Sequence, residues 1–330
     1  MDAPPLVFEP LLKYRVWGGR KLAHLGKQLP PDEVIGESWE ITDLPETTED
    51  GQSRVAHGPM AGRTLRSLIQ EDPQAILGTG ASEDDPFPLL IKFLDAEQNL
   101  SVQVHPPQSY VEKHSDTALK SEAWVILAAE PGAQLYIGLR KGLSAERLKA
   151  QVEAGTFQDE LNRVDAHVGD CHYLPAGTCH ALGEGIVVAE IQTPSDTTFR
   201  VYDWGRTDRT MHITEATECI DFDNPLPPSQ TDAPIEQRGE VRMQRLCDSP
   251  FFTIDRLEAL EDEVLPIETG DQPVIWMVLD GRARIDSADL DHNAVELNRG
   301  MTALLPASLT GSEVAIERGC ILLEVRPLTH

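Results

Sequence analysis

The feature that most constrains the fold is a set of polar side chains from two separate segments, all suited to one metal ion. The segment SVQVHPPQSYVEKHSDTALKSE offers Gln103, His105 and Glu122, and the segment GDCHYLPAGTCH ends in His180. Gln103 and His105 are two residues apart, so a β-strand would direct both side chains to one face. A fold that uses all four as ligands must return the later segment to that face.

These ligand types narrow the choice of ion. Two imidazoles, one amide and one carboxylate make a mostly neutral set that suits a borderline ion such as zinc, whereas calcium would take more carboxylates. Pro175 and Gly177 are typical of a tight turn just before His180. Three nearby residues are alternative ligands: His114, His172 and Cys179.

Local patterns predict strands with a few helices. Residues 64–77, TLRSLIQEDPQAIL, predict a helix, and an amphipathic helix is expected from an N-cap at Ser144 to a stop at Gly155. WVILA at 124–128 and QLYIGL at 134–139 predict strands, and the Glu-Pro-Gly between them predicts a hairpin turn.

The second half of the chain contains degraded copies of these segments. IWMVLDGRARI at 275–285 is similar to WVILAAEPGAQLYI, and GMTALLPASLTG at 300–311 is similar to GDCHYLPAGTCH, but without a histidine to match His180. We therefore expect two related β-barrels, the first with the metal and the second without it, joined by a linker at 224–234, NPLPPSQTDAP. Chance recurrence of Gly-x5-Pro is the alternative, because the chain has 24 glycines and 24 prolines.

Composition limits the remaining possibilities. With 330 residues and 40% hydrophobic content the chain can bury two cores. A formal net charge of -27 argues against a nucleic-acid partner. We expect a cytoplasmic protein, monomeric or a small homo-oligomer, because no apolar run is long enough to span a membrane and no signal peptide is evident. The five cysteines form no C-x-x-C pair and are expected to be reduced thiols.

Several motifs, in the same order, resemble the type I mannose-6-phosphate isomerases in their short bacterial form. They span nearly the whole chain and read VWGGRKL, GESWEI, PLLIKFLDA, LSVQVHP, KSEAW, PAGTCHAL and EIQTPSDTTFRVYDWGR. The resemblance implies a zinc enzyme that interconverts mannose 6-phosphate and fructose 6-phosphate. It implies a mainly β fold of two cupin-like β-barrels of the jelly-roll type with a small helical insertion. Residues 1–223 would form the metal-bearing catalytic domain and residues 235–330 a metal-free one.

The resemblance also implies roles for individual residues. It places one Zn²⁺ per chain on Gln103, His105, Glu122 and His180, the set already chosen from the residues themselves. It implies that Arg200 is catalytic and that Lys120 and Ser101 line the substrate site. The chain departs from the family at Phe199, where a tyrosine is frequent.

A sugar phosphate is an anion, so a chain this acidic needs a local positive patch. Four basic residues are candidates: Arg200, Lys120, Lys92 and Arg15. Each could instead be a solvated surface charge, and we favour that interpretation for Arg15.

The expected chemistry passes through an enediolate, with the metal as electrophile. We expect Arg200 to stabilise the enediolate and Lys120 to orient the substrate or assist ring opening. The identity of the base is left open. Glu190 is the leading carboxylate, and the equal alternative is that Glu190 is a structural acid bonded to Arg200.

Two other classes of function remain possible, a cupin metal-dependent oxygenase and a non-catalytic sugar-binding cupin. Gln103 would be a weak ligand for redox iron, which argues against the oxygenase. A binding module would not need Arg200 and Lys120 around an intact ligand set.

Overall fold

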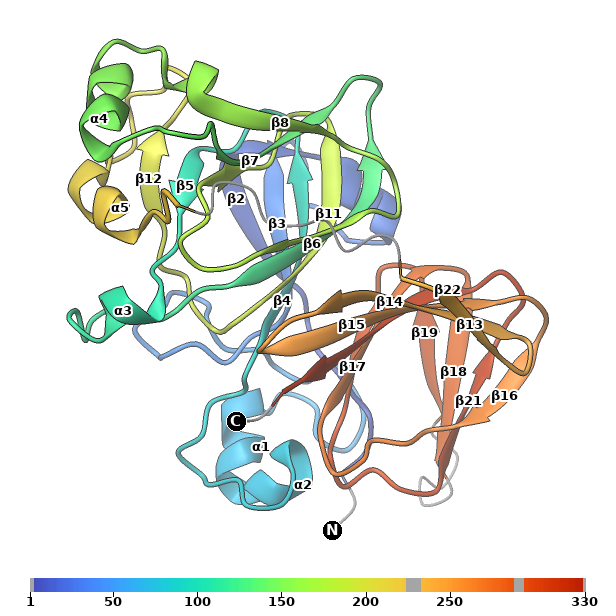
Figure 1. Ribbon diagram of the computed structural model, residues 1–330. Helices are drawn as coiled ribbons and strands as arrows, with labels where there is room; N and C mark the ends of the chain where they lie inside the picture. Colours follow the sequence, from blue (N-terminus) through green and yellow to red (C-terminus); the bar gives the residue numbers. More distant parts are fainter. Residues whose placement is uncertain (1–2, 224–232, 288–293, 329–330) are drawn as a thin grey trace.

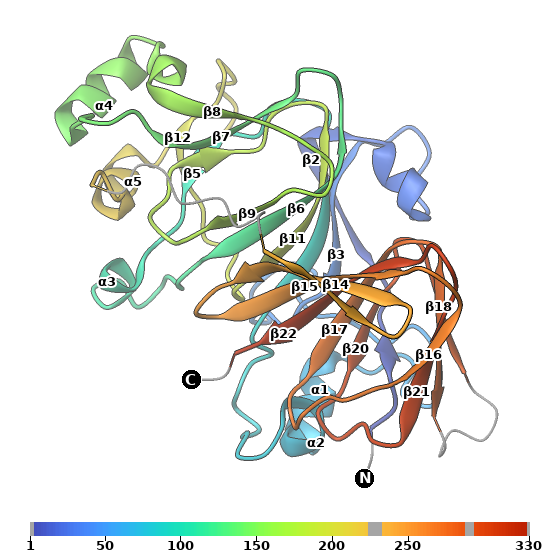
Figure 2. The ribbon, with the colours of Figure 1, turned by 45° about the vertical axis from the view of Figure 1, so that its right-hand side comes forward.

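Antiparallel β-sheets make up most of the regular secondary structure, as expected. The computed structural model describes residues 3–223, 233–287 and 294–328, so most of the predicted linker at 224–234 lies outside the described residues. Figures 1 and 2 show two groups of sheets, one from each half of the chain, packed side by side. The mainly β prediction is confirmed.

The first half of the chain forms two sheets. The six-stranded sheet has the order β2-β3-β4-β11-β6-β9. Its strands are β2 (Leu11–Gly19), β3 (Ile35–Ile41), β4 (Leu90–Ala96), β11 (Ile186–Gln192), β6 (Glu122–Ala129) and β9 (Cys171–Leu174). The five-stranded sheet has the order β12-β5-β10-β7-β8. Its strands are β12 (Phe199–Tyr202), β5 (Val102–Val104), β10 (His180–Ala181), β7 (Gln134–Leu139) and β8 (Leu161–Asp165).

The second half forms two further sheets, and one strand from the amino terminus joins them. The seven-stranded sheet has the order β1-β20-β17-β22-β15-β14-β13. Its strands are β1 (Leu6–Val7), β20 (Thr302–Leu305), β17 (Val274–Asp280), β22 (Ile321–Pro327), β15 (Phe252–Ala259), β14 (Val241–Asp248) and β13 (Ile235–Arg238). The four-stranded sheet has the order β16-β21-β18-β19. Its strands are β16 (Glu263–Pro266), β21 (Ser312–Ile316), β18 (Arg282–Ser287) and β19 (Val295–Asn298).

Helices are short and lie outside the sheets. They are η1 (Lys21–Leu25), α1 (Leu65–Glu71), α2 (Pro73–Leu77), α3 (Gln108–Val111), α4 (Ala145–Glu153), η2 (Phe157–Glu160) and α5 (Ile213–Cys219). The helix predicted from Ser144 is confirmed as α4, because the Ser144 side chain accepts from the Arg147 backbone N–H and Gly155 follows with φ of +70°. No helix in the described ranges is long and apolar enough to cross a membrane.

The predicted internal repeat appears in the strand order. Read in corresponding order, β2-β3-β4-β11-β6-β9 in the first half matches β13-β14-β15-β22-β17-β20 in the second, and β5-β10-β7-β8 matches β16-β21-β18-β19. The predicted hairpin is wrong. β6 pairs with β11 and β9 while β7 pairs with β10 and β8, so the turn after β6 carries the chain from one sheet to the other. β17 and β18 are divided between two sheets in the same way.

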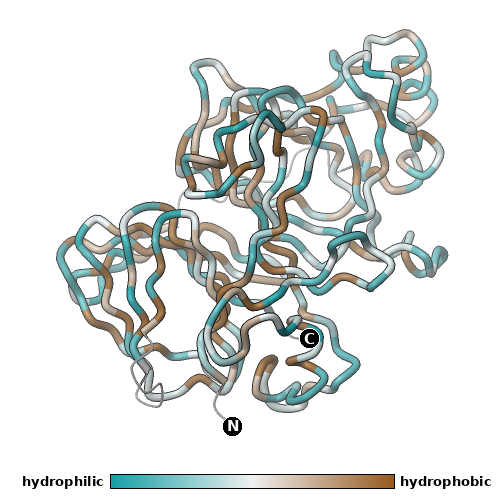
Figure 3. The backbone as a smooth tube through the Cα atoms, turned by 180° about the vertical axis from the view of Figure 1, so that it is seen from behind, coloured by the Kyte–Doolittle hydropathy of each residue, from teal (hydrophilic) through white to brown (hydrophobic). Residues whose placement is uncertain are grey.

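Three hydrophobic clusters hold these sheets in layers. One lies between the six- and five-stranded sheets and includes Trp124 and Ile137, and another lies between the seven- and four-stranded sheets and includes Trp276 and Ile285. The largest joins the outer faces of the two big sheets with α1 and α2. Figure 3 shows the corresponding hydrophobic stretches along the strands, with hydrophilic colour concentrated on the outer loops.

The two halves of the chain are tied together by more than this cluster. Strand β1 leaves the first half and pairs with β20, with Leu6 opposite Leu304. The Lys27 ammonium donates to the Glu40 carboxylate at 2.6 Å and to the Gly300 carbonyl at 2.7 Å. The division into domains at 1–223 and 235–330 stays a prediction.

The buried pair between Lys27 and Glu40 gives a test of this junction. The side chains are only 6% and 4% exposed, and removing one partner leaves an uncompensated buried charge. We expect Lys27→Met to lower the free energy of unfolding by about 3–5 kcal/mol. Urea denaturation measures this loss.

A matched control uses Lys21, whose partners Glu97 and Glu130 are more than half exposed. Lys21→Met should cost at most about 1 kcal/mol. The double change Lys27→Met with Glu40→Met should recover most of the stability, since no lone charge stays buried. Equal losses of stability in Lys27→Met and Lys21→Met would contradict the assignment of Lys27 and Glu40 as a buried ion pair.

Candidate functional site

The four predicted metal ligands meet where the two sheets of the first half face each other. His105, Glu122 and His180 are at most 1% exposed, and among the described residues their ligand atoms form a cluster within 4.8 Å of one another. Gln103 lies opposite His180 in the β5–β10 pair, with its Nε2 3.4 Å from His180 Nε2. The turn formed by Pro175 and Gly177 returns the chain to this point, as expected.

Hydrogen bonds hold both imidazoles with the same nitrogen facing inward. His105 Nδ1 lies 3.0 Å from the Thr197 carbonyl and His180 Nδ1 lies 2.9 Å from the Thr178 carbonyl. A carbonyl only accepts, so each Nδ1 carries a proton, and a neutral ring in this tautomer presents its Nε2 lone pair inward. This is the outer-sphere arrangement typical of metal-ligating histidines.

Those lone pairs point at a carboxylate, which is also an acceptor. His105 Nε2 lies 3.2 Å from one Glu122 oxygen, and His180 Nε2 lies 3.1 Å from the other. Neither buried Glu122 oxygen has a hydrogen-bond partner, although one of them lies 3.0 Å from the Lys120 ammonium. Two ring nitrogens and a carboxylate this close together form a donor set that suits a divalent ion.

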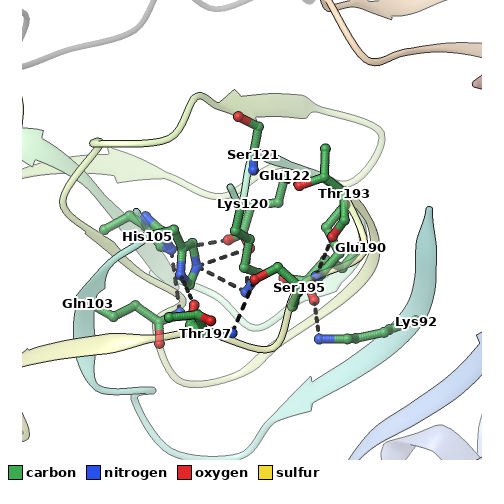
Figure 4. A network of polar contacts seen from close by, with 12 residues as sticks. Lys92, Gln103, His105, Lys120, Ser121, Glu122, Glu190, Thr193, Ser195 and Thr197 are labelled. Carbon is green, nitrogen blue, oxygen red and sulfur yellow. Dashed lines mark hydrogen bonds and ion pairs between the residues drawn. The ribbon is translucent and has the colours of Figure 1, made fainter. Parts of the chain in front are cut away.

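Lys120 is the nearest cation in the chain. Its ammonium lies 3.0 Å from both Glu122 and His105 Nε2, and Figure 4 shows these contacts. Burial would raise the pKa of Glu122, but Lys120 and the imidazoles hold it well below the usual range. Burial and Lys120 lower the pKa of His105 to about 3, so this imidazole is neutral, the form that can bind a metal.

The three alternative ligands lie outside this cluster. His114 stacks on Tyr110 at a ring separation of 3.9 Å and contacts the Tyr110 carbonyl. His172 is opposite Trp124 in the β6–β9 pair, and Cys179 is buried in a separate hydrophobic cluster.

A cavity of about 340 Å³ adjoins the cluster and is lined by several of the predicted site residues. Those that line it are Lys92, Ser101, Gln103, Lys120, Glu190 and Arg200. They come from β4, β5, β11, β12 and the segments before β5 and β6. Of these six residues, Lys92 and Arg200 are farthest apart in the sequence, at 108 positions, yet both line the same cavity.

Glu190 is held by Trp124 and Lys92, and not by Arg200 as the alternative interpretation required. Its carboxylate accepts from the Trp124 indole at 2.9 Å and from Lys92 at 3.1 Å, and no ion pair with Arg200 is present. Figure 4 shows Lys92 pointing at this carboxylate. Burial raises the pKa of Glu190, and the charge of Glu122 adds to the effect of burial against the opposing charge of Lys92.

Arg200 has room for a new anion. Its Nη1 donates to the Thr210 carbonyl at 2.7 Å, while its Nε is buried without a partner. No described carboxylate forms an ion pair with it. Burial and the nearby Arg209 lower its pKa, which is the expected response of a guanidinium without a counter-ion.

Arg15 also belongs to the site, so its interpretation as a solvated surface charge is wrong. It lines the cavity and donates to Glu37 at 2.8 Å. Glu37 also accepts from the Trp39 indole at 2.6 Å and lies 3.9 Å from Lys92. Burial would raise the pKa of Glu37, but Lys92 and Arg15 lower it to about 2.

Sequence reasoning missed other lining residues: Trp17, Glu37, Trp39, Leu94, Leu100, Asp196, Thr198 and Arg209. Trp17, Glu37 and Trp39 belong to the motifs VWGGRKL and GESWEI. The sequence therefore marked these residues, but it did not assign them a role. Arg209 had no motif to mark it. With it, the lining holds five lysines or arginines against three carboxylates, a local positive excess within a chain of net charge -27.

Comparisons with known proteins agree with this geometry. Residues 6–124 match the family described as phosphomannose isomerase type I, catalytic domain. The chain is 33% identical over 329 residues to the probable mannose-6-phosphate isomerase GmuF of Bacillus subtilis, covering 98% of this chain and 99% of that one. It is 36% identical over 262 residues to the mannose-6-phosphate isomerase ManA of B. subtilis, covering 78% and 80%.

Solved structures give the same result for the fold. The crystal structure of the mannose 6-phosphate isomerase from B. subtilis superposes with a TM-score of 0.86 at 28% identity and covers 98% of this chain and 99% of that one. The cupin-like architecture of that group is therefore the architecture of this chain, in agreement with its paired sheets.

The ion pairs of Glu37 predict a pH-dependent stability. Its pKa falls from 4.5 to about 2 on folding, so its contribution is complete above pH 4.5 and is lost as the pH falls toward 2. We expect Glu37→Gln to lower the free energy of unfolding by about 3 kcal/mol at neutral pH. Denaturant titrations at several pH values measure this difference, which should shrink in acid.

The exposed pair of Arg63 and Glu71 supplies the control. Glu71→Gln should change stability by at most about 1 kcal/mol at any pH. A loss in Glu37→Gln that did not vary with pH would contradict the ionised state assigned to Glu37.

Proposed function

This chain belongs to the type I phosphomannose isomerase family, and from that premise we propose that it is a zinc-dependent isomerase that interconverts mannose 6-phosphate and fructose 6-phosphate. The family is one of isomerases, and two relatives carry the name mannose-6-phosphate isomerase. The observation that carries the proposal is a His-Glu-His cluster beside a cavity with excess positive charge. The first suits a divalent ion and the second suits an anionic sugar.

The proposed ligands are His105, His180, Glu122 and Gln103, with one Zn²⁺ per chain. The two inward Nε2 atoms and the buried Glu122 carboxylate between them support this assignment. A zinc ion held there would act as a Lewis acid on the sugar's oxygens and make the adjacent C–H proton more acidic.

The proposed proton transfer uses Glu190. An aldose becomes a ketose when the proton on C2 is removed, the C–H electrons form the C1–C2 double bond of an enediolate, and a proton is then delivered to C1 while the hydroxyl hydrogen moves from O2 to O1. A base that both takes and returns the proton needs a pKa nearer neutrality than an ordinary carboxylate. The raised pKa of Glu190 and its place in the cavity lining support that role.

The remaining polar residues would bind and orient the substrate. Arg200, as the guanidinium without a carboxylate partner, suits the negative charge of the enediolate or substrate. Lys120 lies at the entrance to the ligand cluster and would orient the substrate or assist ring opening. Lys92 holds Glu190 in place, and Ser101 adds a hydroxyl to the lining.

A cytoplasmic location and a monomeric or small homo-oligomeric state stay predictions.

Metal removal tests the proposal directly. A coupled assay follows fructose 6-phosphate formed from mannose 6-phosphate by the purified protein as isolated, after chelation and after zinc is added back. Activity should disappear with the chelator and return with zinc, while circular dichroism shows that the protein stays folded. A folded, zinc-loaded protein without turnover would falsify the isomerase assignment and favour a sugar-binding function.

Two substitutions distinguish the role of the proposed metal ligands from the role of the Arg200 charge. His180→Ala should reduce the bound zinc measured by elemental analysis, together with activity. Arg200→Gln should keep about one zinc per chain yet lower kcat/KM by roughly 10²–10³-fold, the effect of losing one charge-stabilising donor. Arg63→Gln, at an exposed arginine, is the control and should change neither quantity. Loss of zinc in Arg200→Gln would contradict the separate roles.

A further inference from the structure

The second half of the chain contains a cavity at the position that corresponds to the catalytic cavity of the first half. It has a volume of about 260 Å³ and lies among residues of the seven- and four-stranded sheets. One polar feature is repeated. Trp276 and Glu324 are opposite each other in the β17–β22 pair, and the indole donates to the carboxylate at 3.0 Å. Trp124 and Glu190 do the same in the β6–β11 pair.

With that pair as reference, each metal ligand of the first half has a counterpart in the second. Glu122 precedes Trp124 by two residues and lies opposite Leu174, as Val274 precedes Trp276 by two and lies opposite Leu305. The carboxylic acid Glu122 therefore corresponds to the aliphatic residue Val274. Val274 lines the second cavity.

Strand pairing gives the counterparts of the other ligands. His180 lies opposite Gln103 and Ile137, and Val314 lies opposite Leu265 and Ile285 in the matching strands. The counterpart of His180 is therefore Val314, three residues beyond the Gly311 that the sequence repeat places there. His105 and Ile267 each come two residues after the β5 or β16 partner. The three aliphatic residues that replace these ligands line the second cavity: Leu265, Ile267 and Val314. The same backbone positions that gather metal ligands in one half gather aliphatic side chains in the other.

An apolar cavity of this kind has little affinity for water or metal and favours an apolar guest. The cavity interior thus selects against both ligands of the first site, an ion and a sugar hydroxyl. Its occupant must present hydrocarbon to this wall.

The lining of the cavity also carries charge, from Arg238, Glu268, Glu324 and Arg326. Arg326 is fully engaged, because its Nε donates to Glu324 at 2.8 Å and its two Nη atoms donate to the carbonyls of Thr269 and Glu268. Arg238, on the exposed edge strand β13, also lines the cavity. In the part of the chain that the structure describes, no carboxylate forms an ion pair with Arg238.

The repeat explains why Arg238 lacks a partner. Arg15 is its counterpart, since Lys13 lies opposite Glu37 and Glu236 lies opposite Met243 in the matching strand pairs. Arg15 is neutralised by Glu37, but Met243 takes that place in the second half. Arg238 is left as a cation without a carboxylate partner among the described residues, in the lining of a mostly apolar cavity.

From these observations we propose that the cavity between the C-terminal sheets binds a small monocarboxylate with an apolar body. The hydrocarbon lies against Leu265, Val274 and Val314, and the carboxylate pairs with Arg238. This site is distinct from the catalytic cavity, and its occupancy does not depend on the metal.

Isothermal titration calorimetry with the full, zinc-loaded chain tests this site, with octanoate as the probe and 1-octanol as its uncharged counterpart. We expect octanoate to bind one per chain and at least about tenfold more tightly than octanol, as one charge pair worth about 1.4 kcal/mol requires. Arg238→Gln should remove that difference. Arg242→Gln, at an exposed arginine on β14 outside the cavity lining, should leave it unchanged.

A second variant locates the guest. Val314→Trp places a large side chain in the cavity and should abolish binding of both probes, with a normal melting curve showing that the protein is folded. Arg238 is exposed, so Arg238→Gln should fold and still tests the proposal if Val314→Trp does not fold. Absence of octanoate binding, equal affinity for the two probes, or unchanged octanoate affinity in Arg238→Gln would each overturn the proposal.

Discussion

The central strands β3, β4 and β11 of the six-stranded sheet are buried on both faces, and the rest of the structure depends on this. Every residue of β11 is buried, although the strand contains Glu190 and Gln192. Val187, Ala189 and Ile191 face the cluster that joins the two large sheets, and the alternate residues face the inner core and the candidate active-site cavity. The apolar junction holds the strand in register, so the carboxylate on its other face stays in a defined position.

A buried polar face of this kind is possible only when its charges are paired. Glu190 has Lys92 and Trp124, Glu37 has Arg15 and Trp39, and Lys92 lies between the two carboxylates. In the ligand cluster, Glu122 is paired with Lys120 and also faces two imidazoles, so this cluster is a candidate cation site. The cavity lining beside it keeps a local positive excess within a chain of net charge -27.

The same strand order occurs twice, with different chemistry each time. Strand pairing brings corresponding positions together in both halves, so the backbone alone does not decide between a metal site and an apolar cavity. The side chains at four positions do. Gln103, His105, Glu122 and His180 in the first half correspond to Leu265, Ile267, Val274 and Val314 in the second. One architecture can thus carry two sites of different chemistry.

Much of the site could be predicted from the sequence, because its signals are local. The ligand types, their spacing in LSVQVHP and PAGTCHAL, the N-cap at Ser144 and the second, histidine-free copy were all legible without coordinates. The pairing of charges could not be predicted from the sequence. Glu190 binds Lys92 and not Arg200, Arg15 belongs to the cavity, and β6 and β7 lie in different sheets. Periodicity reports which face of a strand is buried, but it does not identify the strand or sheet opposite that face. Only the long-range register of the tertiary structure decides these contacts.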